Sequence, residues 1–275
     1  MKLKYTLIFF VTLFVLTGCS KDEKLEEDVT IPPSQQEQSE EEIKNLPYTF
    51  PLTGIKTAEE PTSRPIAITI NNHPDARPQS GISKADIVYE MLVEGDATRY
   101  LAIFQSNIPE KIGPVRSARD YFIEIAKGFN SLYIAHGYSP EAHQMLNSGV
   151  VDHINGMQYD GIYFKRSANR KAPHNSYITA ENIVLATQKL NISLENEKNV
   201  AYTFYADEDS VKMGNKANKI YMNYFSQNSS YSSIYSYDAE SKKYFKSSPK
   251  RNTVDELVDE QVAISNVLFF ETTHK

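Results

Sequence analysis

A single cysteine, Cys19, in a chain of 275 residues limits the ways in which this chain can be stabilised. Cys19 follows a short apolar stretch over residues 5–16, and Lys2 and Lys4 precede that stretch. This layout is typical of an export signal, and the stretch is too short for a membrane-spanning helix. The exported protein is therefore expected to have no internal disulfide, no cysteine metal site and no cysteine nucleophile.

The four residues Leu16-Thr17-Gly18-Cys19 resemble the lipobox of bacterial lipoproteins. In that class the chain is cleaved before the cysteine, whose sulfur receives a diacylglyceryl group, and two acyl chains such as palmitate anchor it stably. We therefore expect a signal peptide over 1–18, a lipid on Cys19 and a location on the extracytoplasmic face of the cell membrane. An ordinary signal peptide with a chance cysteine, or a buried core cysteine, is the alternative.

Residues 19–47 predict an unfolded stalk. They hold nine acidic residues against three lysines, together with Pro32-Pro33 and a Gln/Ser run. Such a segment buries too little apolar surface to fold, and its charges repel one another. Because the stalk carries most of the chain's net charge of −6, the folded part is nearly neutral. Neither that balance nor an exported location suggests a nucleic-acid partner.

Residues 48–275 are long enough for two domains, and the sequence pattern changes near residue 193. Strands are predicted at 66–70, 87–94, 98–105, 132–136, 150–154 and 162–165, and helices at 120–129, 140–146 and 180–190. Ser117, Ser139 and Thr179 are the predicted N-caps of these helices. The strand–helix–strand order over 132–154 implies a partly parallel sheet. We therefore expect an α/β (α+β) domain with a mixed sheet over 48–193.

Residues 194–275 predict a smaller β-rich domain. Its strands are expected at 200–206, 220–225, 234–237 and 267–270. Tyrosines are dense over residues 221–244, at positions 221, 224, 231, 235, 237 and 244. They are interpreted as half-buried strand residues, with an aromatic binding face for sugars or peptides as the alternative.

The basic residues of the first domain predict an anion site. Arg116 and Arg119 precede the helix that begins at Asp120, where free amides and the helix dipole favour an anion. The predicted anion-binding residues are Arg77, Arg99, Arg116, Arg119, Arg166, Arg170 and His174, with Lys171 beside them. Their expected ligand is an anionic envelope component: a polyprenyl phosphate, a teichoic acid chain or a peptidoglycan carboxylate. The alternative is that these cations pair with the carboxylates of Asp86, Glu90, Glu94, Asp120 and Glu124.

Several segments together resemble one known family. They are Asn71-Asn72-His73, Ala76-Arg77-Pro78-Gln79, residues 85–90, residues 113–119, Gly137-Tyr138-Ser139-Pro140 and Ala172-Pro173-His174-Asn175. With the lipobox and the acidic stalk, they are similar to the YerB-like lipoproteins of Gram-positive bacteria. The resemblance implies an N-terminal and a C-terminal domain of unknown function. Family members continue past the position of His274, which implies that the second domain is incomplete here.

The sequence gives weaker evidence for a catalytic site than for an anion site. Gly137-Tyr138-Ser139-Pro140-Glu141 has the setting of a nucleophile elbow, but Ser139 before a proline is also a preferred N-cap. The spacings of His136, His143 and His153 match no common metal site, so neither a metal nor another cofactor is predicted, although Asp86, Glu90 and Asp120 could hold a hard cation.

We favour a non-catalytic protein that binds an anionic envelope component or a cell-wall synthesis protein. The alternative is a phosphate-handling enzyme, loosely similar to the LytR-CpsA-Psr glycopolymer transferases. That similarity implies that Arg116, Arg119, Arg166 and Arg170 hold a diphosphate and that Asp86 or Asp120 holds a metal ion.

Overall fold

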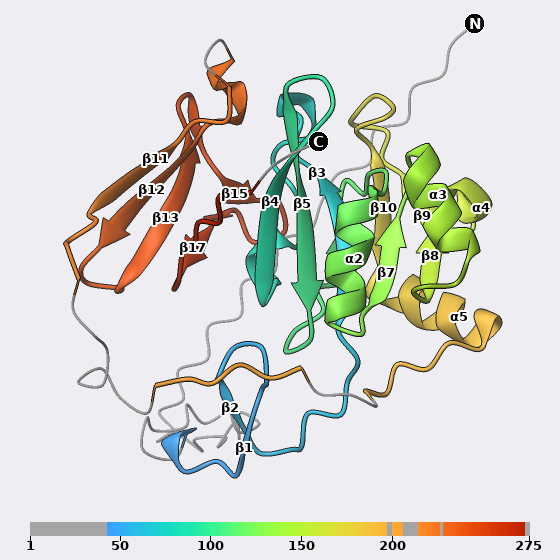
Figure 1. Ribbon diagram of the computed structural model, residues 1–275, viewed down its shortest axis with the longest axis horizontal. Coiled ribbons are helices and arrows are strands. Elements are labelled where there is room, and N and C mark those ends of the chain that lie inside the picture. The colour runs from blue at the N-terminus through green and yellow to red at the C-terminus, as the bar shows by residue number, and fades with distance from the viewer. Residues whose placement is uncertain (1–42, 197–199, 206–213, 226–227, 273–275) are drawn as a thin grey trace, which may run out of the picture. The chain divides into compact units, whose positions relative to one another are not determined.

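The computed structural model describes residues 43–196, 200–205, 214–225 and 228–272 (Figure 1). The predicted signal peptide, Cys19 and most of the predicted stalk lie outside the described residues. Within those residues, no helix combines the length and the apolar character that crossing a membrane requires.

A five-stranded mixed sheet forms the centre of the first part of the chain (Figure 1). Its strand order is β4 (Ile87–Val93), β5 (Ala97–Phe104), β3 (Ile66–Asn71), β7 (Leu132–Ala135) and β8 (His153–Asn155). β3 pairs with β5 in antiparallel fashion and with β7 in parallel, and β7 is parallel to β8. The predicted mixed sheet is confirmed, and the carboxyl ends of β3, β7 and β8 share one edge.

Helices cover both faces of this sheet. On one face, α2 (Asp120–Gly128) and α3 (Pro140–Asn147) bury Phe122, Ile123 and Leu146 against β5 and β7. On the other face, α5 (Ala180–Leu190) buries Ile183 and Ala186 against the alternate side chains of β3. Because successive strand residues point to opposite faces, the fully buried strand β3 contributes to both cores.

Smaller elements complete this part of the chain. A three-stranded antiparallel sheet has the order β6 (Lys111–Ile112), β10 (Ser176–Thr179) and β9 (Phe164–Arg166). Neither β6 nor β10 was predicted from the sequence. The other elements are β1 (Tyr48–Thr49), β2 (Lys56–Thr57), the short helix α4 (Gly156–Tyr159), and the 3₁₀ turns η1 (Pro74–Ala76) and η2 (Ile82–Lys84).

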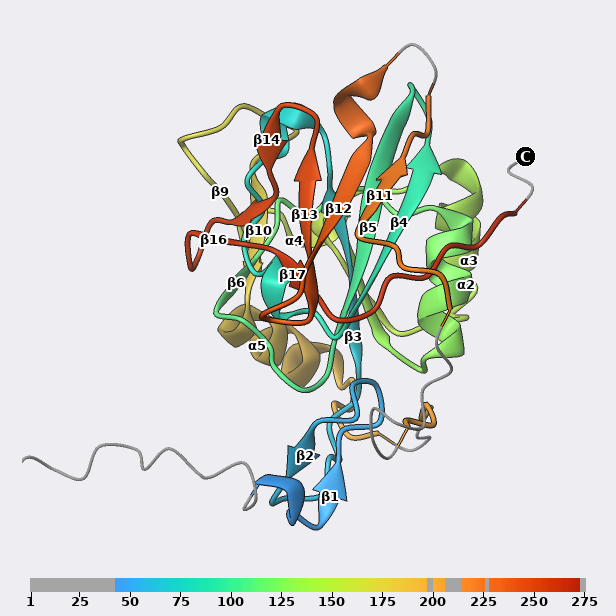
Figure 2. The same ribbon diagram turned by 90° about the vertical axis from the view of Figure 1, so that its left-hand side faces the viewer.

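The later part of the chain is β-rich, as predicted (Figure 2). An antiparallel sheet joins β11 (Lys219–Met222), β12 (Ser233–Asp238), β13 (Lys243–Ser248) and β14 (Arg251–Asn252), and β17 (Ala263–Ile264) also pairs with β13. β15 (Val254–Asp255) pairs with β16 (Glu260–Gln261), and the 3₁₀ turn η4 (Ser229–Tyr231) precedes β12. We refer to residues 214–272 as the β module.

Two predicted strands of the later part are wrong. Residues 200–205 and 267–270 form no strand, although Ala206 lies outside the described residues. Both segments are apolar, but no neighbouring strand pairs with them, and Leu268 and Phe270 are exposed. Strand propensity alone does not form a strand that has no hydrogen-bonding partner.

The helix starts confirm two of the three predicted N-caps. The hydroxyl oxygens of Ser139 and Thr179 accept from the amides of Ala142 and Asn182, at 3.2 and 3.1 Å. Ser117 is not a cap, because its hydroxyl donates to the carbonyl of His136 and Arg119 takes the N-cap position of α2.

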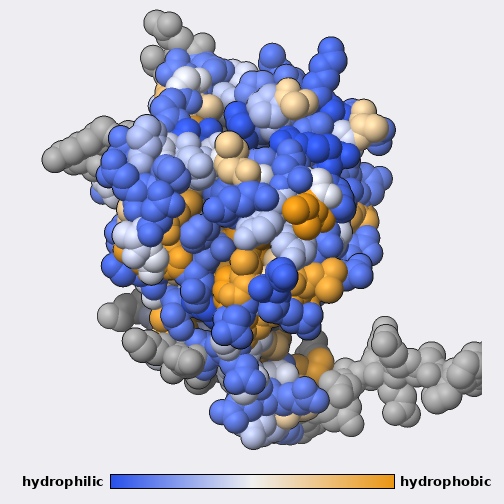
Figure 3. All heavy atoms as spheres, turned by 90° about the vertical axis from the view of Figure 1, so that its right-hand side faces the viewer, coloured by the Kyte–Doolittle hydropathy of each residue, from blue (hydrophilic) through white to orange (hydrophobic). Residues whose placement is uncertain are grey.

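The face of the molecule that carries α3, α4 and α5 is mainly hydrophilic, with scattered apolar patches (Figure 3). Its exposed apolar side chains include Met157 and Ile162 in and after α4, and Val184 and Leu185 on α5. Scattered exposed apolar residues of this kind are common on folded proteins.

Candidate functional site

Three polar segments meet where β3, β7 and β8 end. They are Asn71-Asn72-His73, His136-Gly137 and Asn155-Gly156. In open α/β sheets, ligands bind outside the carboxyl ends of the parallel strands. We therefore describe this edge as the candidate site.

Arg116 is held between β3 and β7 at this edge. Its backbone amide donates to the carbonyl of Thr69 at 2.8 Å, and its carbonyl accepts from the amide of His136 at 3.0 Å. The segment packs so tightly that a Cβ on Gly137, whose φ is +98°, would lie 2.5 Å from the hydroxyl oxygen of Ser117. Gly137 therefore allows the loops after β7 and before α2 to touch.

The Arg116 side chain has no partner. It is half-buried, yet its guanidinium makes no hydrogen bond or ion pair within the described residues. Its burial, together with the nearby charges of Arg119 and Arg166, lowers its pKa. A half-buried cation beside other cations leaves an unsatisfied requirement for negative charge at this point.

Asn71 fixes the protonation pattern of His174. The Asn71 side-chain oxygen accepts from the amide of His73 at 2.9 Å, so its nitrogen faces Nδ1 of His174, also at 2.9 Å. A backbone amide can only donate, which settles the orientation of the Asn71 side chain. Nδ1 of His174 must therefore accept, and the neutral ring carries its proton on Nε2.

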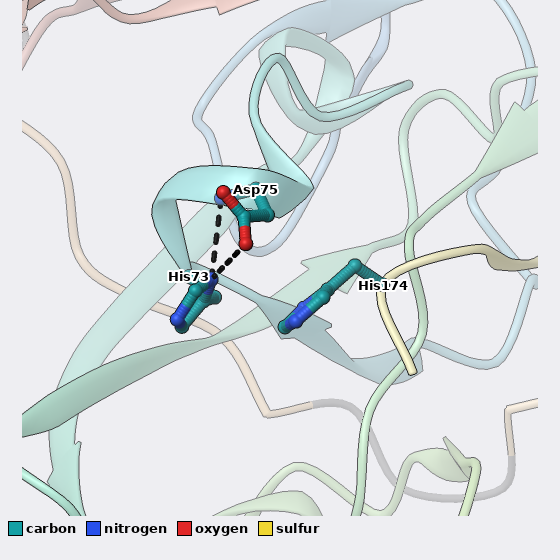
Figure 4. Close-up of side chains that lie close together, drawn as sticks. All are labelled: His73, Asp75 and His174. Atoms are coloured by element: carbon teal, nitrogen blue, oxygen red, sulfur yellow. Dashed lines mark hydrogen bonds and ion pairs between the residues drawn. The ribbon is translucent and has the colours of Figure 1, made fainter. Parts of the chain in front are cut away.

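His73 follows the same pattern (Figure 4). Its Nδ1 accepts from the backbone amide of Asp75 at 3.2 Å, so its neutral ring also carries the proton on Nε2. The rings of His73 and His174 are stacked, with centroids 4.4 Å apart and an angle of 22° between their planes. No described residue accepts from either Nε2, so the pair presents two free N–H donors.

The donor atoms of His73, Asp75 and His174 lie within 4.8 Å of one another, as in some metal sites. The arrangement does not suit a metal ion. Lone pairs of ring nitrogens lie in the ring planes, and two nearly parallel stacked rings do not direct them at a common point. In addition, metal-bound histidines usually donate from their second nitrogen, whereas Nδ1 of His174 faces the Asn71 amide; Nδ1 of His73 accepts from the Asp75 amide and lies 3.6 Å from the Asp75 carboxylate. The pair suits a hydrogen-bond acceptor such as an oxyanion.

Arg99 and Arg119 lie close to Arg116. Arg99 is buried, and its Nη1 donates to the carbonyl of Ser117 at 2.7 Å. Burial, followed by the charges of Arg119 and Arg116, lowers the Arg99 pKa to about 10, so it stays charged at neutral pH. Arg119 pairs through two nitrogens with Glu94, and this contact lowers the Glu94 pKa to about 2. Arg119 therefore has a carboxylate partner, which was the alternative to anion binding in the sequence analysis.

Arg166 and His136 form the third part of the site. Arg166 pairs with Asp160 at 2.9 Å, and the same nitrogen donates to Nε2 of His136 at 3.1 Å. His136 therefore carries its proton on Nδ1 and donates to the hydroxyl of Ser176 at 2.7 Å. Burial and Arg166 lower the pKa of His136. A histidine that donates to this buried serine is not placed to act as its general base.

The seven predicted anion-binding residues fall into two groups. Arg99, Arg116, Arg119, Arg166 and His174 surround the candidate site. Arg77 and Arg170 are directed elsewhere. Arg77 donates to backbone carbonyls of Asn72 and Ser230, and Arg170 donates to those of Ala76 and Pro78 and pairs with Glu256.

Asp86 and Asp120, which the enzyme interpretation assigned to a metal ion, do not lie together. Asp86 accepts from the amides of Gln105 and Ser106, at the end of the sheet opposite to Asn71. Asp120, the first residue of α2, is half-buried beside Arg119. Ser139, the candidate nucleophile, accepts a capping bond from Ala142. These positions provide no paired metal ligands and no activated nucleophile at the site.

Asn71 and His73 were not predicted from the sequence as functional residues, and His136 was considered only as a metal ligand. The signal was a run of polar residues directly after a buried strand. Such a run at the end of one parallel strand indicates a site only when the neighbouring strands are known.

The fold defines a class: a mixed α/β domain followed by a β module. Residues 52–193 match the family described as "Protein of unknown function (DUF3048) N-terminal domain". The chain is 43% identical over 225 residues to "Putative lipoprotein YerB" of Bacillus subtilis (strain 168), and the match covers 82% of this chain and 67% of that protein. The crystal structure of YerB protein from Bacillus subtilis superposes with a TM-score of 0.72 at 42% identity, covering 79% of this chain and 72% of the YerB chain. The chain belongs to the YerB-like lipoprotein family, which confirms the predicted membership.

Proposed function

We propose that this protein is anchored by a lipid on Cys19 to the extracytoplasmic face of the cell membrane and binds an anionic component of the cell envelope. Residues 1–18 are the signal peptide, and residues 19–47 are the stalk that separates the anchor from an α/β domain over 48–193 and a β-rich domain over 194–275. The lipobox and the family relationship to a lipoprotein support the anchor.

The unpaired guanidinium of Arg116 is the observation that supports anion binding. Two neighbouring arginines already have carboxylate partners, Arg119 in Glu94 and Arg166 in Asp160, whereas Arg116 has none among the described residues. The free Nε2–H groups of His73 and His174 lie at the same end of β3, because Asn71 bonds to His174 and the backbone of Arg116 bonds to Thr69. The Arg116 charge adds to the lowering of the His174 pKa. A phosphate or carboxylate at this place would supply both the negative charge and the acceptors.

The ligand proposal is tested with Arg116→Gln. We expect the purified protein to bind inorganic phosphate in isothermal titration calorimetry, and the variant to lose about tenfold in affinity, the equivalent of one charge-assisted hydrogen bond. Lys127→Gln removes an exposed cation from α2 and should bind like the parent protein. Absence of phosphate binding by the parent protein, or equal loss in both variants, would contradict the proposal.

The anchor is tested separately in cells. We expect incorporation of labelled palmitate into the parent protein and no incorporation into Cys19→Ser. A precursor whose size does not change when the lipoprotein signal peptidase is inhibited by globomycin would contradict lipid anchoring.

A further inference from the structure

A cavity of about 360 Å³ lies between the loop after η1 and the β module. The loop contributes Arg77 and Gln79, and the β module contributes residues of the β13–β14 turn and of β15. The polar residues that matter for its chemistry are Arg77, Ser248, Arg251, Asn252 and Asp259.

The two arginines of this cavity have no carboxylate partner. Arg251, on the short strand β14, is exposed, and its side chain makes no contact with a hydrogen-bonding or charged group within the described residues. Arg77 donates only to neutral oxygens, which belong to Asn72 and Ser230. With Asp259 as the one acidic residue lining it, the described cavity has a net positive charge.

Arg77 and Tyr231 connect this cavity to the candidate site. The Arg77 guanidinium lies 5.6 Å from the centre of the Tyr231 ring. The same ring meets the ring of His73 in an edge-to-face arrangement, with centroids 6.5 Å apart. Tyr231 is buried and contacts both His73 of the histidine pair and Arg77 of the cavity. The cavity therefore adjoins the site whose free donors are His73, His174 and Arg116.

We propose that this cavity is a second anion subsite, which takes a further phosphate group of an extended polyanion whose first group occupies the candidate site. The inference rests on the proposed function, and it specifies the ligand class as a chain with repeated phosphate groups. A single phosphate reaches one subsite, whereas a chain engages both and gains affinity because the second contact is intramolecular.

The experiment compares three probes of increasing length: inorganic phosphate, tripolyphosphate and long-chain polyphosphate. The parent protein is expected to bind the long chain at least about tenfold more tightly than phosphate. Arg251→Gln should lower the ratio of these two affinities about threefold, since one exposed cation is removed. Lys219→Gln, which removes an exposed cation from β11 of the same sheet, should leave the ratio unchanged.

The outcomes separate the two proposals. Binding of phosphate with no gain for the longer chains, or a ratio that Arg251→Gln leaves unchanged, overturns the second subsite and leaves the first in place. An equal fall in Arg251→Gln and Lys219→Gln also overturns it, because polyphosphate then responds only to overall charge. Absence of binding for every probe overturns the proposed function itself.

Discussion

At the scale of single residues, two histidines of the site, His136 and His174, have pKa values below the ordinary value. Burial lowers the pKa of both rings. The charge of Arg166 adds to the effect for His136, and the charges of His73 and Arg116 add to it for His174. Each ring also has a nitrogen that faces a donor, Arg166 for His136 and Asn71 for His174, and this contact is lost on protonation. Both surroundings therefore favour the neutral imidazole of His136 and of His174 over the imidazolium.

These pKa shifts predict how stability depends on pH. Because the folded-state pKa of His136 lies below the ordinary value of about 6.5, the unfolded chain binds more protons as the pH falls through the window below that value. The contribution to stability is complete above about pH 7 and is lost on acidification through this window. We expect the urea midpoint of the parent protein to fall between pH 7.5 and pH 5.

His136→Gln isolates the contribution of this ring to the pH dependence. The variant should show a smaller fall in midpoint between the two pH values than the parent protein. His143→Gln removes a histidine of α3 that lies outside the site and serves as the control. An unchanged pH dependence in His136→Gln would show that this ring is not held neutral.

Gly156 determines where the His136 ring lies. A Cβ built on Gly156 would approach the ring to 2.2 Å, so Gly156→Ala cannot be accommodated unless the ring moves. We expect Gly156→Ala to lower the free energy of unfolding by about 1–3 kcal/mol, measured by urea denaturation. Gly128→Ala at the end of α2, where a Cβ meets nothing within 4 Å, should cost nothing. Equal effects in the two variants would contradict a specific contact with His136.

At the scale of helices and strands, local sequence patterns predicted most elements of the first domain. The strands β4 and β5 and the helices α2, α3 and α5 lie within one or two residues of their predicted bounds, since their apolar periodicity is decided locally. β10 was missed, because its four residues lack a pattern of their own and depend on pairing with β6 and β9. β13 was missed because it contains Lys243 and Lys246, which are depleted in strands.

The candidate site was predictable only in part. Arg116 and Arg119 could be predicted as site residues, because arginines that precede a helix are a local feature of the sequence. The pairing of Arg119 with Glu94 and of Arg166 with Asp160 joins side chains from different elements. The free state of Arg116 follows from those pairings, which residue types and spacings do not specify.

The start of α3 supplies a prediction at this scale. Ser139 caps the helix through its hydroxyl, and Pro140 occupies the first turn. Ser139→Ala should lower the free energy of unfolding by about 1 kcal/mol, measured by chemical denaturation, because one amide of the first turn loses its acceptor. Phosphate affinity should not change, since Ser139 is a cap rather than a nucleophile. Loss of phosphate binding with full stability would contradict this role.

At the scale of the whole molecule, a buried ion pair joins the α/β domain to the β module. Lys246 of β13 lies 2.8 Å from Glu90 of β4, and both side chains are less than 10% exposed. Burial has the largest single effect and opposes the charge on Lys246. Glu90, Tyr100 and Tyr235 together outweigh it, so that the pKa of Lys246 is raised. Glu90 also accepts from Asn72, Thr98 and Ser233, which connects the β module to the strand end that carries His73.

Glu90 and Lys246 differ in the interactions that each keeps when the other is removed. We therefore expect the two removals to have unequal effects. Without Lys246, the Glu90 carboxylate keeps three donors. Without Glu90, the buried ammonium of Lys246 retains the hydroxyls of Ser233 and Tyr235 and the faces of the Tyr100 and Tyr235 rings, but no carboxylate partner among the described residues. We expect Glu90→Met to lower the free energy of unfolding by about 3–5 kcal/mol, and Lys246→Met to cost less.

A double-mutant cycle in urea denaturation measures the coupling between the two charges. Glu90→Met combined with Lys246→Met should cost less than the two single changes added together, because no charge is then left buried without its partner. Additive costs would show that the charges do not interact across the interface. A double variant as stable as the parent protein, with weakened phosphate binding, would instead show that the pair is retained to place the strand end that carries His73 rather than to stabilise the fold.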